Sequence, residues 1–144
     1  MTGGGAAVVD SQPLIALLLD EPAAAAVEGL LRAGGTRIST VSIAEVLDVL
    51  TRREGLPWDD VELVLAGLLS EALEPVAPDV AAAHRAADVR RRHFDRRTLR
   101  ISLADCFVIA TAQPGDRVAT GDRVLLDVAR AEGLDVVDLE AAKG

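Results

Sequence analysis

Short apolar runs alternate along the chain with longer segments in which apolar residues recur at helical spacing. The runs typical of β-strands cover residues 6–9, 37–40, 73–77, 117–120 and 136–139. The segments predicted to be helical cover residues 13–19, 22–32, 43–53, 57–69, 79–97, 103–113 and 123–132. In the third of these, Ile43, Val46, Leu47 and Leu50 follow the spacing of one helix face. Strands separated by helices favour parallel pairing, so the pattern predicts an α/β fold.

The breaks between these segments are short. Gly34-Gly35 suits a helix end, Pro57 a helix start and Pro114-Gly115 a turn. There is no repeat or long linker, and 144 residues fit one domain over residues 1–144, with residues 1–5 expected to be a flexible lead-in. No stretch resembles a signal peptide or approaches the ~18 uninterrupted apolar residues of a membrane span. We therefore expect a cytoplasmic protein with no membrane partner.

Acidic residues stand where the predicted strands end. Asp10 follows the strand 6–9 and Asp122 follows the strand 117–120. Ser42 to Glu45 has the spacing of a capping box, which places Glu45 in the first turn of a helix. The segment from Ser102 to Asp105 repeats this spacing with an aspartate. Ligands bind at the carboxyl ends of parallel strands, so we expect the four acids on one edge of the sheet.

Each of these acids could be no more than a helix cap. Four on one edge are harder to explain in that way, because converging carboxylates raise one another's pKa unless cations intervene. All-oxygen ligands suit Mg²⁺ or Mn²⁺, and paired ions could organise the displacement at a phosphate. The hydroxyls of Ser11 and Thr120 could orient a carboxylate or a water molecule, or could simply be turn residues.

The net charge of −8 conceals a local excess of positive charge. Seven of the 14 arginines fall between Arg85 and Arg100, in and just after the predicted helix 79–97. Within that helix, Arg85, Arg92 and Arg96 would lie close to one face, and Arg90 and Arg97 would share a second. The segment is either a solvated helix surface or a basic patch for phosphates or an acidic partner.

Other reactive or aromatic side chains are few. Cys106 is the only cysteine, which excludes an internal disulfide, and we expect it to be a small buried apolar residue. His84 and His93 are expected on the surface. With only two Phe, one Trp and no Tyr, the sequence offers no obvious aromatic platform for stacking bases.

Four stretches of the sequence, in this order, resemble the PIN-domain ribonucleases, and most closely the VapC-type toxins of toxin–antitoxin pairs. They cover nearly the whole chain, and the ordered set is far more specific than any one of them. The stretches are Val8-Val9-Asp10-Ser11, Ile38-Ser39-Thr40-Val41-Ser42-Ile43-Ala44-Glu45-Val46-Leu47, Ser102-Leu103-Ala104-Asp105-Cys106-Phe107-Val108-Ile109-Ala110 and Val118-Ala119-Thr120-Gly121-Asp122.

The resemblance implies a five-stranded parallel sheet of order 3-2-1-4-5 and RNA cleavage that depends on a divalent metal ion. It also implies a homodimer and inhibition by a small antitoxin protein. The catalytic, metal-binding acids would be Asp10, Glu45, Asp105 and Asp122, supported by Thr120. Family members often have a small residue at the position of Gln12, which leaves the role of Ser11 uncertain. In this interpretation, Arg85, Arg92 and Arg96 are candidates to contact RNA or the antitoxin.

Two other functions are compatible with an acidic α/β fold. A phosphoacceptor receiver domain needs paired acids after its first strand and a lysine after a late one. Here Asp10 stands alone after the first strand, and the only lysine is Lys143 near the end of the chain. A non-catalytic PIN-like module that binds RNA or protein is the second alternative, and the complete set of acids argues against it.

Overall fold

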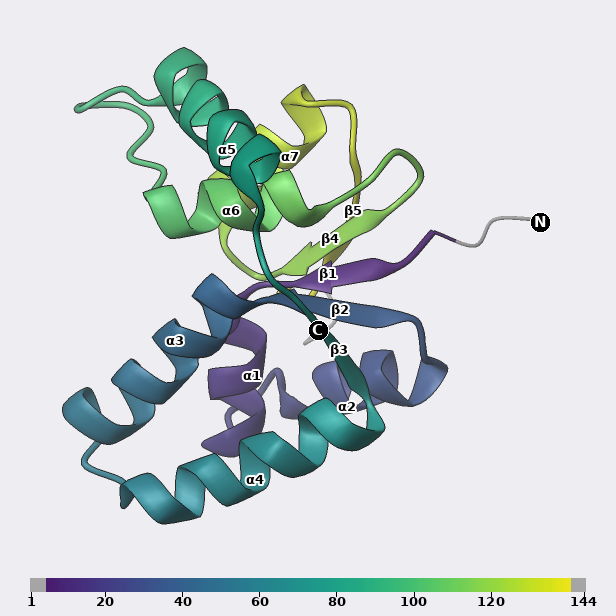
Figure 1. Cartoon of the computed structure of the whole chain (residues 1–144), viewed down its shortest axis with the longest axis vertical. Coiled ribbons are helices and arrows are strands. Elements are labelled where there is room, and N and C mark those ends of the chain that lie inside the picture. Colours follow the sequence, from purple (N-terminus) through teal and green to yellow (C-terminus); the bar gives the residue numbers. More distant parts are fainter. Residues whose placement is uncertain (1–4, 141–144) are drawn as a thin grey trace.

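The computed structural model describes residues 5–140 and confirms the expected alternation of strands and helices (Figure 1). The strands are β1 (Ala7–Val9), β2 (Thr36–Ser39), β3 (Leu73–Val76), β4 (Arg117–Thr120) and β5 (Asp135–Asp138). The helices are α1 (Ser11–Leu18), α2 (Ala24–Ala33), α3 (Thr40–Asp48), the π-helical turn η1 (Val49–Arg53), α4 (Trp58–Glu71), α5 (Val80–His93), α6 (Leu103–Thr111) and α7 (Arg123–Ala131). Among these described helices, none is long and apolar enough to cross a membrane.

The five strands form one parallel sheet in the order β3-β2-β1-β4-β5, as the sequence resemblance implied. The central strand β1 pairs on both sides, with Val8 opposite Arg37 of β2 and Val118 of β4. Pro75 lies in β3, an edge strand, where the missing N–H of proline is tolerated. Because all strands run in the same direction, their carboxyl ends meet at one edge of the sheet.

Two apolar cores form because successive side chains of a strand point to opposite faces of the sheet. Val8 and Val118 pack with α5, α6 and α7, whereas Val9 and Ala119 pack with α1 to α4. Figure 1 shows these two groups of helices above and below the sheet. Both faces are therefore covered, which accounts for the continuous apolar character of the central strand β1.

Helix α5 is shorter than the sequence pattern predicted, ending at His93 instead of continuing to residue 97. The Asp95 carboxylate accepts hydrogen bonds from the backbone N–H groups of Arg97 and Thr98, and Asp95 and Leu99 form an isolated antiparallel bridge. These local bonds compete with helix continuation. The expectation that Arg96 shares a helical face with Arg85 and Arg92 is therefore wrong, since Arg96 lies in the loop that follows the helix.

The start of α3 also differs from the prediction. Its N-cap is Ser39, whose hydroxyl accepts a hydrogen bond from Val41 N at 3.1 Å, so the helix begins at Thr40. The capping box expected at Ser42 is absent, and Ser42 is fully buried. Most of the expected lead-in, residues 1–4, lies outside the described residues. Gly5, its last residue, is described and packs so closely on Gly115 that a Cβ would lie 1.7 Å from the carbonyl oxygen.

Candidate active site

Asp10 lies at the carboxyl end of β1 and caps the N-terminus of α1. Its carboxylate accepts a hydrogen bond of 2.7 Å from Ser11 N, and the residue is only 3% exposed. The Ser11 hydroxyl, also buried, lies 3.5 Å from the same Asp10 oxygen. Since β1 is the central strand, Asp10 occupies the middle of the carboxyl edge.

Thr120 connects Asp10 to the end of the neighbouring strand. Its hydroxyl donates to Asp10 Oδ2 at 3.0 Å and accepts from Asp122 N at 3.1 Å. Asp122 caps α7, accepting from Val124 N at 2.9 Å. The sequence placed both aspartates on the same edge, and the structure joins them through one buried hydroxyl. Thr120 is thus more than a turn residue.

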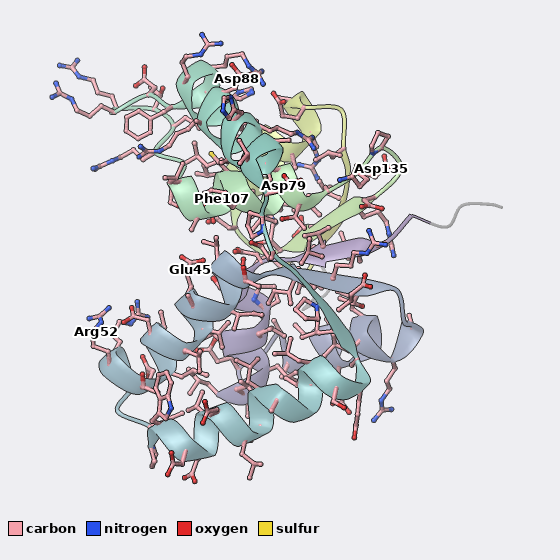
Figure 2. All side chains as sticks on the ribbon, in the orientation of Figure 1. Glu45, Arg52, Asp79, Asp88, Phe107 and Asp135 are labelled. Carbon is pink, nitrogen blue, oxygen red and sulfur yellow. The ribbon has the colours of Figure 1, made fainter. Side chains whose placement is uncertain are left out.

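Glu45 and Asp105 reach this edge from the two sides of the sheet. Glu45 lies in the second turn of α3 and is half-buried, and Figure 2 shows it on the part of α3 nearest α6, far from Arg52. Asp105 lies in the first turn of α6, whose N-cap Ser102 accepts from Asp105 N at 3.0 Å. Helices α3 and α6 contact each other, and their N-terminal halves bring these two carboxylates toward Asp10.

The electrostatics show that the four acids share one environment. Burial raises the pKa of Asp10 to about 6, although the Ser11 N–H and the Thr120 hydroxyl lower it, and the charges of Glu45 and Asp122 add to the rise. Burial also raises the pKa of Asp105 to about 7, with further contributions from the charges of Asp10, Asp122 and Glu45. The structure thus brings the four acids together, and we refer to them as the acidic cluster.

The acidic cluster has the donors that a divalent cation requires. Burial raises the pKa of Glu45, and its buried Oε1 atom has no hydrogen-bond partner among the described residues. A buried oxygen without a donor is costly, and a hard cation would satisfy it. Within residues 5–140, however, no three His, Cys, Asp or Glu side chains converge at coordination distance. The charges of the carboxylates affect one another's pKa at distances longer than a metal–oxygen bond. The four side chains therefore fit a cation whose binding would draw them closer together.

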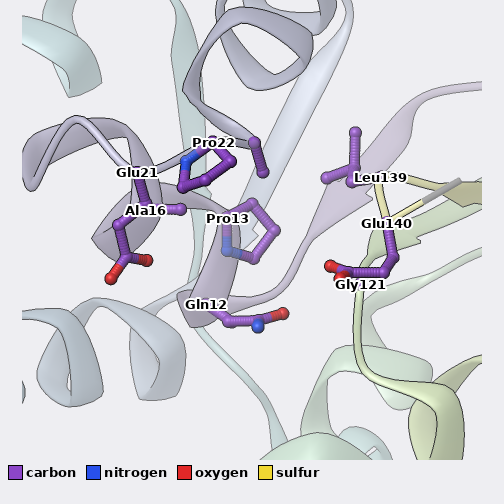
Figure 3. Close-up of a pocket in the computed structure, with 9 residues that line it drawn as sticks. Gln12, Pro13, Ala16, Glu21, Pro22, Gly121, Leu139 and Glu140 are labelled. Atoms are coloured by element: carbon purple, nitrogen blue, oxygen red, sulfur yellow. The ribbon is translucent and has the colours of Figure 1, made fainter. Parts of the chain in front are cut away.

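A cavity of about 290 Å³ adjoins the carboxyl edge between the start of α1 and the end of β5 (Figure 3). Gln12 and Glu140 point toward each other across its rim, and a Cβ added to Gly121 would lie 3.3 and 3.1 Å from their side-chain oxygens. Gln12 is the departure from the family pattern noted in the sequence. It follows Ser11 directly, yet it is exposed and faces this cavity.

The three arginines selected from the sequence do not form one patch. Arg85 donates to the carbonyl oxygen of Ala112 at 2.7 Å. Arg92 forms ion pairs with Asp88 and with Glu132, the C-cap residue of α7, at 2.9 and 2.7 Å. Arg96 is exposed in the loop after α5. The first two arginines therefore serve the packing of α5 against its neighbours.

Two side chains have partners that the sequence did not reveal. His93, expected on the surface, is half-buried and hydrogen bonds with Glu132 at 2.7 Å. Glu132 was not singled out, because it lies 39 residues from His93 in the sequence and no local pattern connects them. Cys106 is fully buried as expected, and burial raises the pKa of its thiol to about 11.

The sequence matches the family model of the PIN domain over residues 7–131. The chain belongs to the PIN domain family. The match begins with β1 and ends with α7, and so includes all four acids of the cluster. No curated protein sequence matches the chain.

Solved structures of similar fold have low sequence identity to this PIN domain. A DNA-bound VapBC from Salmonella typhimurium matches with a TM-score of 0.70 and 18% identity, covering 94% of this chain and 99% of the other. VapBC2 from Rickettsia felis, bound to a promoter DNA fragment, matches with a TM-score of 0.66 and 15% identity, covering 91% of this chain and 96% of the other. A toxin–antitoxin complex from Klebsiella pneumoniae matches with a TM-score of 0.61 and 18% identity, covering 84% of this chain and 90% of the other. At these identities the likeness establishes the fold.

Proposed function

We propose that this PIN domain is an endoribonuclease that depends on Mg²⁺ or Mn²⁺, held by Asp10, Glu45, Asp105 and Asp122. The observation that carries the proposal is the acidic cluster, in which burial raises the pKa of three of the four carboxyls and like charge adds to the rise for Asp10 and Asp105. An assembly of this kind is unfavourable by itself and becomes favourable with a cation among the carboxylates. All-oxygen ligands favour Mg²⁺ or Mn²⁺ over zinc.

When bound, the metal ions would activate the attacking water and stabilise negative charge at the phosphate. The residues of the chain do the positioning. Thr120 fixes the Asp10 carboxylate through Oδ2, and Ser11 N fixes it through Oδ1. Two hydrogen bonds to one carboxylate hold its plane, which would keep Asp10 oriented to bind a metal ion. The hydroxyl of Ser11 lies between Asp10 and Glu45 and lowers the pKa of Glu45.

We further propose that the chain is the toxin of a type II toxin–antitoxin pair. Solved structures of similar fold include a toxin–antitoxin complex and VapBC assemblies, and the sequence stretches around the four acids resemble VapC toxins. A small antitoxin would be its protein partner, a second copy of the chain would form a homodimer, and the cytoplasm would be its location. The partner is tested by asking whether a short gene lies directly upstream, and by co-expressing its product with this chain and purifying a complex.

The nuclease is tested with RNA substrates in EDTA and after addition of Mg²⁺ or Mn²⁺. We expect EDTA to stop cleavage, either metal ion to restore it, and Asp10→Ala to abolish it while the circular dichroism spectrum stays unchanged. A matched control is Asp59→Ala, which removes an exposed acid from the first turn of α4. Full cleavage after exhaustive chelation, or by the Asp10→Ala protein, would contradict the proposal. Binding of RNA without any metal binding would instead favour a non-catalytic module.

A further inference from the structure

The loop of residues 94–100 is the first part of the connection from α5 to α6, and this connection projects from the side of the molecule at which the strands end (Figure 1). Its turn is stabilised internally by the Asp95 carboxylate and by backbone bonds of 2.7 and 3.0 Å between Asp95 and Leu99. The loop is therefore an ordered projection. It leads directly to Ser102, the N-cap of the helix that carries Asp105.

This loop carries arginines that differ from those of α5 in having no partner. In α5, Arg90 donates a hydrogen bond to Ile101 O, and Arg91 bonds to Asp88. Arg92 bonds to both Asp88 and Glu132. By contrast, the loop has three exposed arginines whose side chains form no hydrogen bond or ion pair with any described residue. They are Arg96, Arg97 and Arg100. The one acid in the loop, Asp95, accepts hydrogen bonds from the backbone N–H groups of Arg97 and Thr98. Ion pairs thus offset the charges of Arg91 and Arg92 on the helix, whereas the charges of the three loop arginines are available to a ligand.

Beside these arginines lies an aromatic surface that the sequence composition did not suggest. Phe94 is 39% exposed, and Leu103, the first residue of α6, is 48% exposed. With Ala87, Arg90 and Arg91, they line a shallow cavity of about 360 Å³. The Arg90 guanidinium carbon lies 4.6 Å from the Phe94 ring centroid, and Arg90 Nε donates to Ile101 O at 3.1 Å. The ring and the guanidinium are therefore positioned before any ligand arrives.

We propose that Phe94, Arg90 and Leu103, together with Arg96, Arg97 and Arg100, form a docking surface for single-stranded RNA. An unpaired base would stack on the Phe94 ring and the Arg90 guanidinium, while the loop arginines contact adjacent phosphates. Stacking requires a base that is free of its complement, so the surface favours single strands over duplexes. This inference rests on the proposed nuclease function and identifies the form of RNA that it would accept.

The position of this surface supports its role beside the acidic cluster. Leu103 and Asp105 share the first turn of α6, so a strand that crosses the N-terminus of this helix passes from one to the other. A chain with a net charge of −8 repels a polyanion overall, and a local group of free arginines near the carboxyl edge offsets that repulsion. An acidic peptide would need the arginines alone, whereas the exposed ring beside them fits a nucleobase.

The test is the affinity of the full chain for a fluorescent single-stranded RNA, measured against salt concentration in EDTA. We expect Arg96→Ala/Arg97→Ala to weaken binding and to reduce the slope of log K against log salt by about 1.4, from about 0.7 per phosphate contact. Phe94→Ala should weaken binding roughly tenfold with an unchanged slope, and Phe94→Trp should restore it. The same RNA annealed to its complement should bind more weakly to the wild type and be insensitive to Phe94→Ala.

A matched control removes two arginines from the opposite edge of the sheet, where helices α2 and α7 end. Arg32→Ala/Arg130→Ala changes the net charge equally, and we expect it to leave the salt slope within error of the wild type. Equal RNA affinity for the wild type, the loop double variant and Phe94→Ala would overturn the inference, even if the wild type cleaves RNA in Mg²⁺. A loss of affinity confined to the loop and Phe94 variants, in a chain that cleaves nothing, would support the surface and contradict only the nuclease.

Discussion

Thr120 donates a hydrogen bond of 3.0 Å to Asp10, a residue 110 positions earlier in the chain, and both side chains are buried. The same hydroxyl accepts from Asp122 N, so it orders two members of the acidic cluster at once. Thr120 touches neither metal nor RNA in the proposed mechanism. It is a positioning residue, and its substitution should affect metal affinity more than fold.

The first prediction concerns Thr120→Val, which keeps the shape of the side chain and removes the hydroxyl. Asp10 Oδ2 and Asp122 N each lose a partner, which should cost about 1–3 kcal/mol of folding free energy. We expect weaker Mn²⁺ binding by calorimetry and slower RNA cleavage, with Thr120→Ser restoring both. Val and Ser variants with the same Mn²⁺ affinity would show that the hydroxyl does not position the cluster.

The second prediction concerns pH and the metal-free protein. Burial and like charge raise the pKa of Asp105 from 3.8 to about 7 in the folded state. A raised folded-state pKa gives stability that is fully present below about 3.8 and is lost as the pH rises through about 7. The substitution Asp105→Asn removes this loss of stability, because an amide does not ionise.

In EDTA, the free energy of unfolding of the wild type should therefore fall between pH 5 and pH 8. At about 1.4 kcal/mol per pKa unit, the contribution from Asp105 is on the order of 2–3 kcal/mol. The Asn variant should show a flatter profile and be more stable at pH 8, by urea unfolding. Parallel profiles for the two proteins would remove Asp105 from the coupled cluster.

The third prediction concerns Glu132, which joins α7 to the end of α5. The Arg92 guanidinium, with a further contribution from His93, lowers the pKa of Glu132 to about 2 despite partial burial. A lowered folded-state pKa gives stability that is present above about 4.5 and is lost as the pH falls through about 2. Glu132→Gln should lower the melting temperature at pH 7 by about 2–4 °C and make it less sensitive to acid. A melting temperature equal to that of the wild type at pH 7 would contradict this.

The fourth prediction contrasts two glycines. At Gly5, an added Cβ would lie 1.7 Å from Gly115 O, and the backbone on both sides would have to move. Gly67 lies inside α4, where nothing is within 4 Å of the added atom. Gly5→Ala should therefore destabilise the protein by about 1–3 kcal/mol, whereas Gly67→Ala should stabilise it by about 0.5–1 kcal/mol. Both values come from the same chemical unfolding experiment, and equal shifts would contradict the close contact at Gly5.

The alternation of strands and helices was predictable because each element has its own apolar period. The edge position of Asp10 and Asp122 followed from the same pattern, since Asp10 comes directly after β1 and Asp122 comes two residues after the end of β4. The pairing of Arg92 with Glu132 could not be inferred, because Glu132 lies 40 residues away and pairs through packing of α5 near α7. The end of α5 was missed because the turn depends on one side chain, Asp95, bonding to its own backbone. The sequence made no prediction for Phe94, whose exposure follows from its place at the end of α5.

The place of β1 at the centre of the sheet affects when the acidic cluster can form during synthesis. β1 leaves the ribosome first, yet one of its two partners is β4, 110 residues later, and Asp10 meets Thr120 only across that pairing. Domains form during synthesis as their segments emerge, and contacts this distant in sequence form late. An incomplete chain therefore has Asp10 without Thr120, Asp122 or the helix they precede. In the proposed toxin, a nascent or truncated product that stops before β4 would hold only part of the acidic cluster, and the capacity to cut RNA would arise only once β4 and Asp122 have been made.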